Sequence, residues 1–276
     1  MSQDAPRTDL AAKTVLYSMP GTEQVIVRRD EPYRVTESGP LTMDLYYPHG
    51  AAPGTRLPAL VIVFGYSDIG YPNMLGCRFK EMGMTVSWAR LFAASGMVAV
   101  VYTNRQPAED VDAVLQSLRE NAARLGIDEN RIGLWAGSGN VPLALSLLMQ
   151  DEREYLKCAA LCNGFLLDLD GATGVAEAQK TYRFANPCAG KSVDDVRSDV
   201  PLFIVRSGQD QFGGVNESID NFMPRAVRRN VPVTFVNHAP APHGFDVFHD
   251  SDTTREIVRQ ILGFMQCHLS AGTPKE

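Results

Sequence analysis

The sequence lacks the features that mark membrane, secreted and nucleic-acid-binding proteins. No uncharged apolar run approaches the roughly 18 residues needed to span a bilayer as a helix, and residues 1–13 contain no apolar stretch typical of a secretory signal. The net charge is −6, and the densest basic group is only Arg225, Arg228 and Arg229. We therefore expect a soluble, cytoplasmic protein with neither a membrane nor a nucleic acid as partner.

Cysteine is too scarce and scattered for a disulfide framework. The five cysteines are odd in number and widely spread, which is typical of buried, reduced thiols. Cys158 and Cys162 lie close together, but the second pair of ligands that a zinc site needs does not accompany them. The sequence gives no reason to expect a metal or another cofactor.

Repeats, low-complexity tracts and Pro/Gly-rich linkers are also missing, so nothing divides the chain into parts. A length of 276 residues with 45% hydrophobic residues suits a single domain with a large core. We expect one domain over 1–276, with an N-terminal extension over about 1–20. Two irregular stretches, 65–85 and 164–199, are long enough to carry function, and the second is a candidate lid or insertion. A homodimer remains possible.

Eight apolar segments have the length and pattern of β-strands. Residues 41–47 alternate apolar and polar side chains, as one buried face requires, whereas residues 59–64 are apolar throughout, as in a central parallel strand. After an antiparallel start, strands and helices alternate, which predicts an α/β protein with a doubly wound, mostly parallel sheet. The predicted strands are 24–28, 41–47, 59–64, 97–103, 131–136, 157–162, 201–206 and 231–237.

The predicted helices have a 3.6-residue apolar period or a recognisable start. Pro224 is expected to kink or split the helix in which it lies. The helices cover 86–95, 108–125, 139–150, 217–228, and a last segment that opens with a capping box at 253–256.

Ser138 lies in a Gly-Ser-Gly turn between the fifth strand and a helix. A serine in such a sharp turn presents its hydroxyl above the sheet and needs small neighbours, which Gly137 and Gly139 provide. The usual G-x-S-x-G spelling would have glycine where Ala136 and Asn140 stand. A Gly-Ser-Gly turn by itself is more often a plain connection or a phosphate-binding loop.

Two further polar residues follow the ends of predicted strands. Asp210 follows the seventh strand and His243 the eighth, and such strand ends meet at one edge of an open α/β sheet. A serine needs a base that is oriented by a third group, so we predict Ser138 as nucleophile, His243 as base and Asp210 as orienting acid. His238, almost within its strand, and Asp246, close in sequence to His243, are less favoured for these roles.

Because Ser138, Asp210 and His243 follow the fifth, seventh and eighth strands, the chain resembles the α/β-hydrolase family over nearly its whole length. The spellings Ser207-Gly208-Gln209-Asp210 and His243-Gly244-Phe245 are similar in particular to its dienelactone-hydrolase-like and small-ester esterase branches. The resemblance implies an α/β-hydrolase fold, with an eight-stranded, mostly parallel sheet and helices on both faces.

The resemblance also implies an oxyanion hole, which the family forms from the residue after the nucleophile and a residue in the loop after the third strand. These positions correspond to Gly139 and Tyr66. Phe64 stands where the family commonly has histidine, so the Tyr66 phenol and Ser67 are alternatives to the Tyr66 backbone N–H.

The resulting prediction is a serine esterase that cleaves a small or medium carboxylic ester through an acyl-serine intermediate. Its predicted partner is this small-molecule ester substrate. Asn140 is expected to place a polar group near the substrate. Trp88 is expected to line an apolar acyl pocket with Met74, Met82 and Met84, unless these side chains belong to the core. The alternatives are a peptidase or acyltransferase on the same fold, and a non-catalytic ligand-binding protein that kept the fold.

Overall fold

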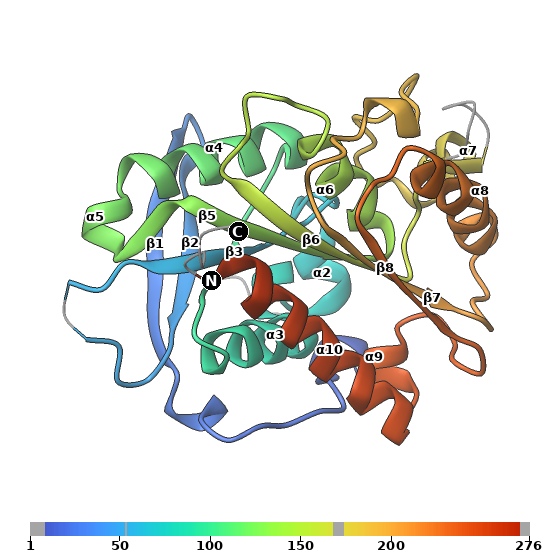
Figure 1. The fold of residues 1–276 in the computed structure, drawn as a ribbon. Coiled ribbons are helices and arrows are strands. Elements are labelled where there is room, and N and C mark those ends of the chain that lie inside the picture. The colour runs from blue at the N-terminus through green and yellow to red at the C-terminus, as the bar shows by residue number, and fades with distance from the viewer. Residues whose placement is uncertain (1–8, 53, 168–173, 271–276) are drawn as a thin grey trace.

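The structure, a computed structural model, describes residues 9–52, 54–167 and 174–270. Eight strands form one sheet in the order β1-β2-β4-β3-β5-β6-β7-β8 (Figure 1). β2 pairs antiparallel with β1 and β4, and the other pairs are parallel, which confirms the predicted fold and its antiparallel start. The strands are β1 (Ile26–Thr36), β2 (Gly39–Tyr47), β3 (Leu57–Ile62), β4 (Val98–Tyr102), β5 (Ile127–Gly137), β6 (Leu156–Cys162), β7 (Leu202–Ser207) and β8 (Val233–His238).

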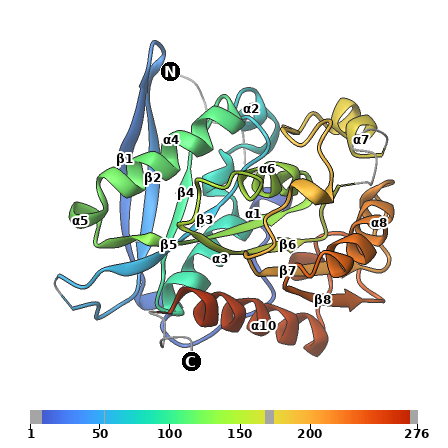
Figure 2. The same ribbon diagram turned by 45° about the horizontal axis from the view of Figure 1, so that its top comes forward.

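Helices cover both faces of the sheet: α3 and α10 pack on one face, and α4, α6 and α8 on the other (Figures 1 and 2). These helices are α3 (Gly83–Ala94), α4 (Pro107–Glu120), α6 (Val141–Leu147), α8 (Val215–Arg228) and α10 (Asp252–Leu269). The remaining helices are α1 (Asp9–Ala12), α2 (Tyr71–Leu75), α5 (Ala122–Leu125), α7 (Gly174–Tyr182) and α9 (Phe245–Phe248), with 3-10 turns at Thr22–Gln24, Phe79–Glu81, Ser138–Asn140 and Val193–Asp195. None of the helices in the described ranges is long and apolar enough to cross a membrane.

The core lies on both sides of the central strands. All five residues of β4 are buried, because a strand covered by helices on both faces has no solvent-facing side. The apolar stripe of α4, which includes Val111, Val114 and Leu118, is buried against the sheet, as its period predicts.

Four helix predictions differ from the structure. The last helix does not open with the predicted capping box at 253–256, because Ser251 is its N-cap and accepts the Thr254 backbone N–H. The helix predicted over 108–125 is interrupted at Asn121, whose side-chain amide donates to the Ser117 carbonyl oxygen at 2.9 Å and so competes with helix continuation. The segment predicted as one helix from Gly139 begins as a 3-10 turn before α6. Pro224 lies inside a continuous α8; because it is exposed, water can satisfy the carbonyl group that its missing N–H leaves unpaired.

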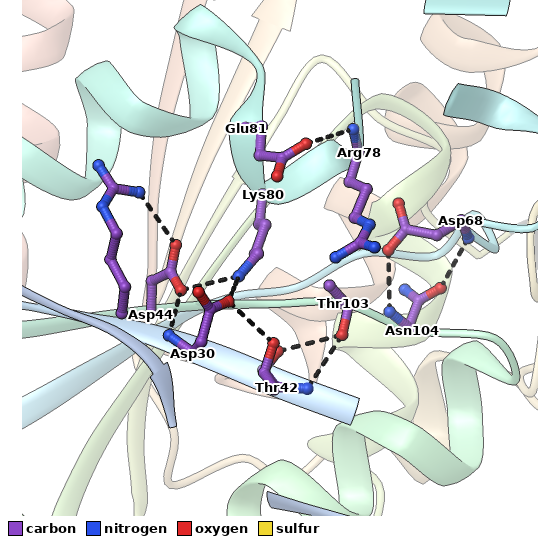
Figure 3. A network of polar contacts seen from close by, with 10 residues as sticks. Asp30, Thr42, Asp44, Asp68, Arg78, Lys80, Glu81, Thr103 and Asn104 are labelled. Carbon is purple, nitrogen blue, oxygen red and sulfur yellow. Dashed lines mark hydrogen bonds and ion pairs between the residues drawn. The ribbon is translucent and has the colours of Figure 1, made fainter. Parts of the chain in front are cut away.

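The stretch over 65–85, predicted to be irregular, holds α2, a 3-10 turn and the start of α3. Its order depends on a buried lysine (Figure 3). The Lys80 ammonium lies 2.8 Å from Asp44 Oδ1 and 2.8 Å from Asp30 Oδ1, and the lysine and Asp44 side chains are almost completely buried. The Lys80 hydrogen bond and charge lower the pKa of Asp30. These ion pairs fasten the segment to β1 and β2.

A second set of contacts, made by Asp68, holds the beginning of the stretch over 65–85. The Asp68 carboxylate accepts a hydrogen bond from the backbone N–H of Asn104 at 2.9 Å (Figure 3) and another from the backbone N–H of Phe79 at 3.0 Å. Burial raises the pKa of Asp68, and the two backbone donors act in the opposite direction. The segment between β3 and α3 is thereby joined to the end of β4.

The region predicted as a possible lid, 164–199, is only partly described, since residues 168–173 lie outside the described ranges. Its described part contains α7 and the 3-10 turn Val193–Asp195. The same holds for the predicted N-terminal extension, of which residues 1–8 are not described and residues 9–12 form α1.

We predict that Asp44→Asn lowers the free energy of unfolding by about 3 kcal/mol, because removing one partner of a buried ion pair leaves the Lys80 charge poorly compensated. Chemical denaturation measures the change. Glu177→Gln, which breaks the exposed Glu177–Lys180 pair, is the matched control and should cost about 0.5 kcal/mol or less. Equal, small losses for both variants would contradict a structural role of the buried pair.

Candidate active site

Ser138 occupies a strained turn at the end of β5. Its φ is +58°, a left-handed conformation that non-glycine residues rarely adopt. Tight packing surrounds the turn. A Cβ added at Gly164 would lie 2.6 Å from the Ser138 carbonyl oxygen, and one added at Gly139 would lie 2.8 Å from Phe184 and in contact with the Tyr66 hydroxyl. Only glycine therefore fits at these two positions without displacement of the neighbours.

The structure brings the three predicted triad residues into one hydrogen-bonded chain. His243 Nε2 lies 2.8 Å from Ser138 Oγ, and His243 Nδ1 lies 2.7 Å from Asp210 Oδ2. The Asp210 carboxylate is buried, and its other oxygen accepts the backbone N–H of Phe212 at 2.9 Å. A carboxylate beside Nδ1 holds the proton on that nitrogen and leaves Nε2 as the acceptor for the serine proton.

Tyr66 lies above the turn with its phenol next to Gly139 and Ser138. A Cβ added at Gly139 would touch the Tyr66 hydroxyl, so the phenol oxygen lies directly beside that residue. Burial raises the pKa of Tyr66 to about 12, and a hydrogen bond with Ser138 acts in the opposite direction. Of the alternatives for a donor in this loop, the phenol is favoured over Ser67, whose hydroxyl donates to the Arg105 carbonyl oxygen at 2.8 Å.

Asn140 connects the Tyr66 loop to the serine turn. Its Oδ1 accepts the backbone N–H of Gly65 at 2.7 Å, and its Nδ2 donates to the carbonyl oxygen of Gly137 at 2.9 Å. Asn140 was predicted to bind substrate. It does border the cavity described next, but both ends of its amide are engaged in holding the two loops together.

A cavity of about 370 Å³ opens at Ser138 and His243. Its walls are mostly apolar, and they include Met74, Met82 and Met84 as predicted. Trp88, predicted to bind substrate, instead lies fully buried in the core and donates its indole N–H to the buried Asp246 carboxylate at 2.7 Å. On an apolar helix, a side chain that faces the sheet has the same sequence pattern as one that faces a pocket.

Two peripheral segments complete the cavity walls. Leu10 and Lys13 from the N-terminal segment line it, and so does Tyr182 at the end of α7. The N-terminal segment is held by a hydrogen bond from the Leu16 N–H to the Asp246 carbonyl oxygen at 2.8 Å. The backbone N–H of Ala185 donates to the Gly65 carbonyl oxygen at 2.7 Å, which fixes the segment after α7 against the Tyr66 loop.

Other candidate residues lie outside the hydrogen-bonded triad. His238 is buried at the end of β8, where its Nε2 lies 3.1 Å from Thr254 Oγ1, and burial lowers its pKa. Asp246 does not contact His243 Nδ1, although it lines the cavity. Within the described ranges, no group of three His, Cys, Asp or Glu side chains is arranged to hold a metal ion.

Comparison with known proteins reveals similarity in structure rather than in sequence. No family model matches the chain, and no curated protein matches it in sequence. The native thermophilic esterase 2 of the planctomycete Thermogutta terrifontis has a TM-score of 0.66 at 21% identity, covering 94% of this chain and 96% of that chain. Its butyrate-bound structure has a TM-score of 0.65 at 21% identity, covering 94% and 98%. Its paraoxon-phosphorylated structure has a TM-score of 0.64 at 20% identity, covering 92% and 98%.

This likeness confirms the α/β-hydrolase fold predicted from the order of strands, helices and polar strand ends. At about one identical residue in five, it is a similarity of fold.

We predict that Tyr66 stays protonated up to about pH 12 in the folded protein. Unfolded tyrosine ionises near pH 10, so burial of the neutral phenol stabilises the fold fully below about pH 10, and this stability is lost as the pH rises towards 12. A phenolate absorbance titration of the wild type minus that of Tyr66→Phe measures the group. A difference curve centred near pH 10 would contradict the buried, hydrogen-bonded placement.

Proposed function

We propose that this protein is a serine esterase that cleaves small or medium carboxylic esters through an acyl-serine intermediate. The observation that carries the proposal is the continuous hydrogen-bonded chain from Ser138 through His243 to Asp210, which ends at an apolar cavity. Such a chain turns an unreactive hydroxyl into a nucleophile. A ligand-binding protein would have no need of this arrangement, so an enzyme is the favoured function.

In the proposed reaction, Ser138 Oγ attacks the ester carbonyl carbon while His243 Nε2 takes the serine proton. The Asp210 carboxylate holds the ring in the required tautomer and stabilises the imidazolium that forms. The carbonyl oxygen becomes an oxyanion, for which the backbone N–H of Gly139 and the phenol of Tyr66 are the proposed donors.

The tetrahedral intermediate then collapses as the bond to the alcohol oxygen breaks. The alcohol takes the proton from His243 and leaves, and the acyl group remains bound to Ser138. Water attacks the acyl carbonyl in the same way, gives its proton to His243, and releases the carboxylic acid as the serine is reprotonated.

The similar solved structures support an ester as substrate. They are of an esterase, and they include forms with butyrate bound and with paraoxon-derived phosphorylation. A cavity of about 370 Å³ suits a small or medium substrate. Of the two resembling branches, the small-ester esterase branch fits these structures better, and the His243-Gly244-Phe245 spelling is compatible with it.

We predict that Ser138→Ala lowers kcat/KM for p-nitrophenyl butyrate by about 10⁴-fold or more, because no nucleophile remains, and leaves the melting temperature nearly unchanged, because alanine keeps the same backbone conformation. Paraoxon should add one phosphoryl group to the wild type, detected by intact mass, and none to Ser138→Ala.

Ser67→Ala is the matched control, since that hydroxyl is turned towards the Arg105 carbonyl, and it should keep both turnover and labelling. Ester turnover by folded Ser138→Ala at the wild-type rate would rule out the proposed nucleophile. Peptide amides and alcohol acceptors assayed in parallel separate an esterase from a peptidase and an acyltransferase.

We further predict that Tyr66→Phe lowers kcat by about 10²- to 10³-fold with little change in KM, because the phenol acts on the oxyanion of the transition state rather than on bound substrate. Tyr71→Phe is the matched control: Tyr71 lines the same cavity and its ring lies 5.9 Å from that of Tyr66. Equal kcat values for wild type and Tyr66→Phe would leave the backbone N–H groups as the only donors.

A further inference from the structure

The active-site cavity has an exposed mouth and a closed polar end. The exposed side chains at the mouth are the apolar Leu10, Met74 and Phe248, which are 48%, 66% and 47% exposed, and the cationic Lys13. At the closed end, buried residues with polar atoms line the cavity; they include Thr85, Trp135, Cys162, Asn163 and Asp246.

Asp246 is the charged member of this closed end. Its Oδ2 accepts the Trp88 indole N–H. Within the described ranges no lysine or arginine forms an ion pair with it, and His243, which is paired with Asp210, acts on it through its charge without an ion pair. Lys13 also borders the cavity, but its ammonium lies over the Phe248 ring, 5.5 Å from the centroid. A buried carboxylate without a cation is costly, and this burial raises the pKa of Asp246.

One acceptor among the described residues of the closed end has no hydrogen-bond partner. Asn163 lies directly after β6 with a φ of +36° and is only 4% exposed. Its Oδ1 is buried and accepts no hydrogen bond within the described ranges. An unsatisfied buried acceptor costs free energy, so Asn163 offers an acceptor to a donor, and the Asp246 carboxylate lines the same cavity.

The closed end corresponds to the acyl side of an ester. During the proposed reaction the alcohol must leave and water must enter while the acyl group stays on Ser138, and this exchange requires the open mouth. The acyl group therefore occupies the part of the cavity away from the mouth, where Asp246 lies. A protonated amine on the acyl group would supply both the missing positive charge and the hydrogen-bond donors.

Building on the esterase reaction above, we propose that Asp246 is a specificity-determining residue that binds a protonated amine on the acyl group, which makes amino-acyl esters the substrate class. Asn163 Oδ1 supports the same amine. Trp88 positions the Asp246 carboxylate through its indole N–H. The apolar mouth is left to receive an apolar alcohol.

The test compares L-alanine benzyl ester with benzyl propionate, which share the alcohol and differ in the α-amino group. At about pH 6.5 the amine is protonated, since α-amino groups titrate near 7.7. Asp246→Asn keeps an oxygen for the Trp88 indole and removes the charge. The quantity measured is the ratio of kcat/KM for the amino ester to that for the propionate, in which general effects on catalysis cancel.

We expect Asp246→Asn to lower this ratio by about 10- to 100-fold, the loss expected for a hydrogen bond to a charged group. Asp220→Asn, which removes a carboxylate from the exposed Arg206–Asp220 pair on α8, is the control and should leave the ratio unchanged. An unchanged ratio in Asp246→Asn would overturn the amine proposal and leave ester hydrolysis standing.

Failure of the wild type to cleave either ester would instead count against the esterase function itself. Inhibition of the wild type provides a measurement that does not depend on how the variant folds. Propylammonium should inhibit benzyl propionate hydrolysis competitively, at a concentration about tenfold or more below that of neutral propionamide. Equal inhibition by the two compounds would overturn the proposal.

Discussion

The left-handed backbone of Ser138 is the constraint on which the rest of the site depends. A non-glycine residue pays a conformational cost in this region, and the turn persists because β5 ends and α6 begins directly beside it. So sharp a turn leaves no room for side chains at Gly139 and Gly164. The space beside Gly139 is filled by the Tyr66 phenol, and the Asn140 amide ties the Tyr66 loop to the turn. One backbone conformation thus fixes both the nucleophile and the groups around it.

The triad was predictable because its placement follows from strand order alone. Parallel strands deliver the residues after their carboxyl ends to one edge of the sheet, and apolar runs mark where β5, β7 and β8 end. Ser138, Asp210 and His243 each follow such a run by a few residues, so no knowledge of side-chain packing was needed to expect them together. The sheet with its antiparallel start followed from the same reading of periodicity, since burial on one or both faces leaves a distinct pattern.

The walls of the cavity were not predictable, because they depend on contacts between segments that are distant in the sequence. Trp88 and Met84 lie on one apolar helix, yet only the methionine reaches the cavity. Lys80 was unremarkable in sequence, where a lysine usually indicates a solvated surface; its burial against Asp44 orders a segment that otherwise has too little apolar periodicity to be recognised. The contributions of Leu10 and Lys13 come from an N-terminal segment whose sequence gives no sign of where it docks.

The proposed catalytic residues and the walls of the cavity consequently belong to different parts of the fold. The triad residues follow strands of the central sheet, whose position is set by a large buried core and cannot shift without global unfolding. The cavity is closed by the N-terminal segment, the stretch around α2 and the segment after α7, each attached by a few hydrogen bonds such as Leu16 to Asp246 and Ala185 to Gly65. Substitutions beside these two hydrogen bonds should change the shape of the cavity at little cost to the core, unlike substitutions in the buried Lys80–Asp44 pair. The preference for an acyl group can therefore vary among proteins of this fold while the hydrogen bonds that link Ser138, His243 and Asp210 stay the same. For this reason, closely similar folds at low identity need not share a substrate.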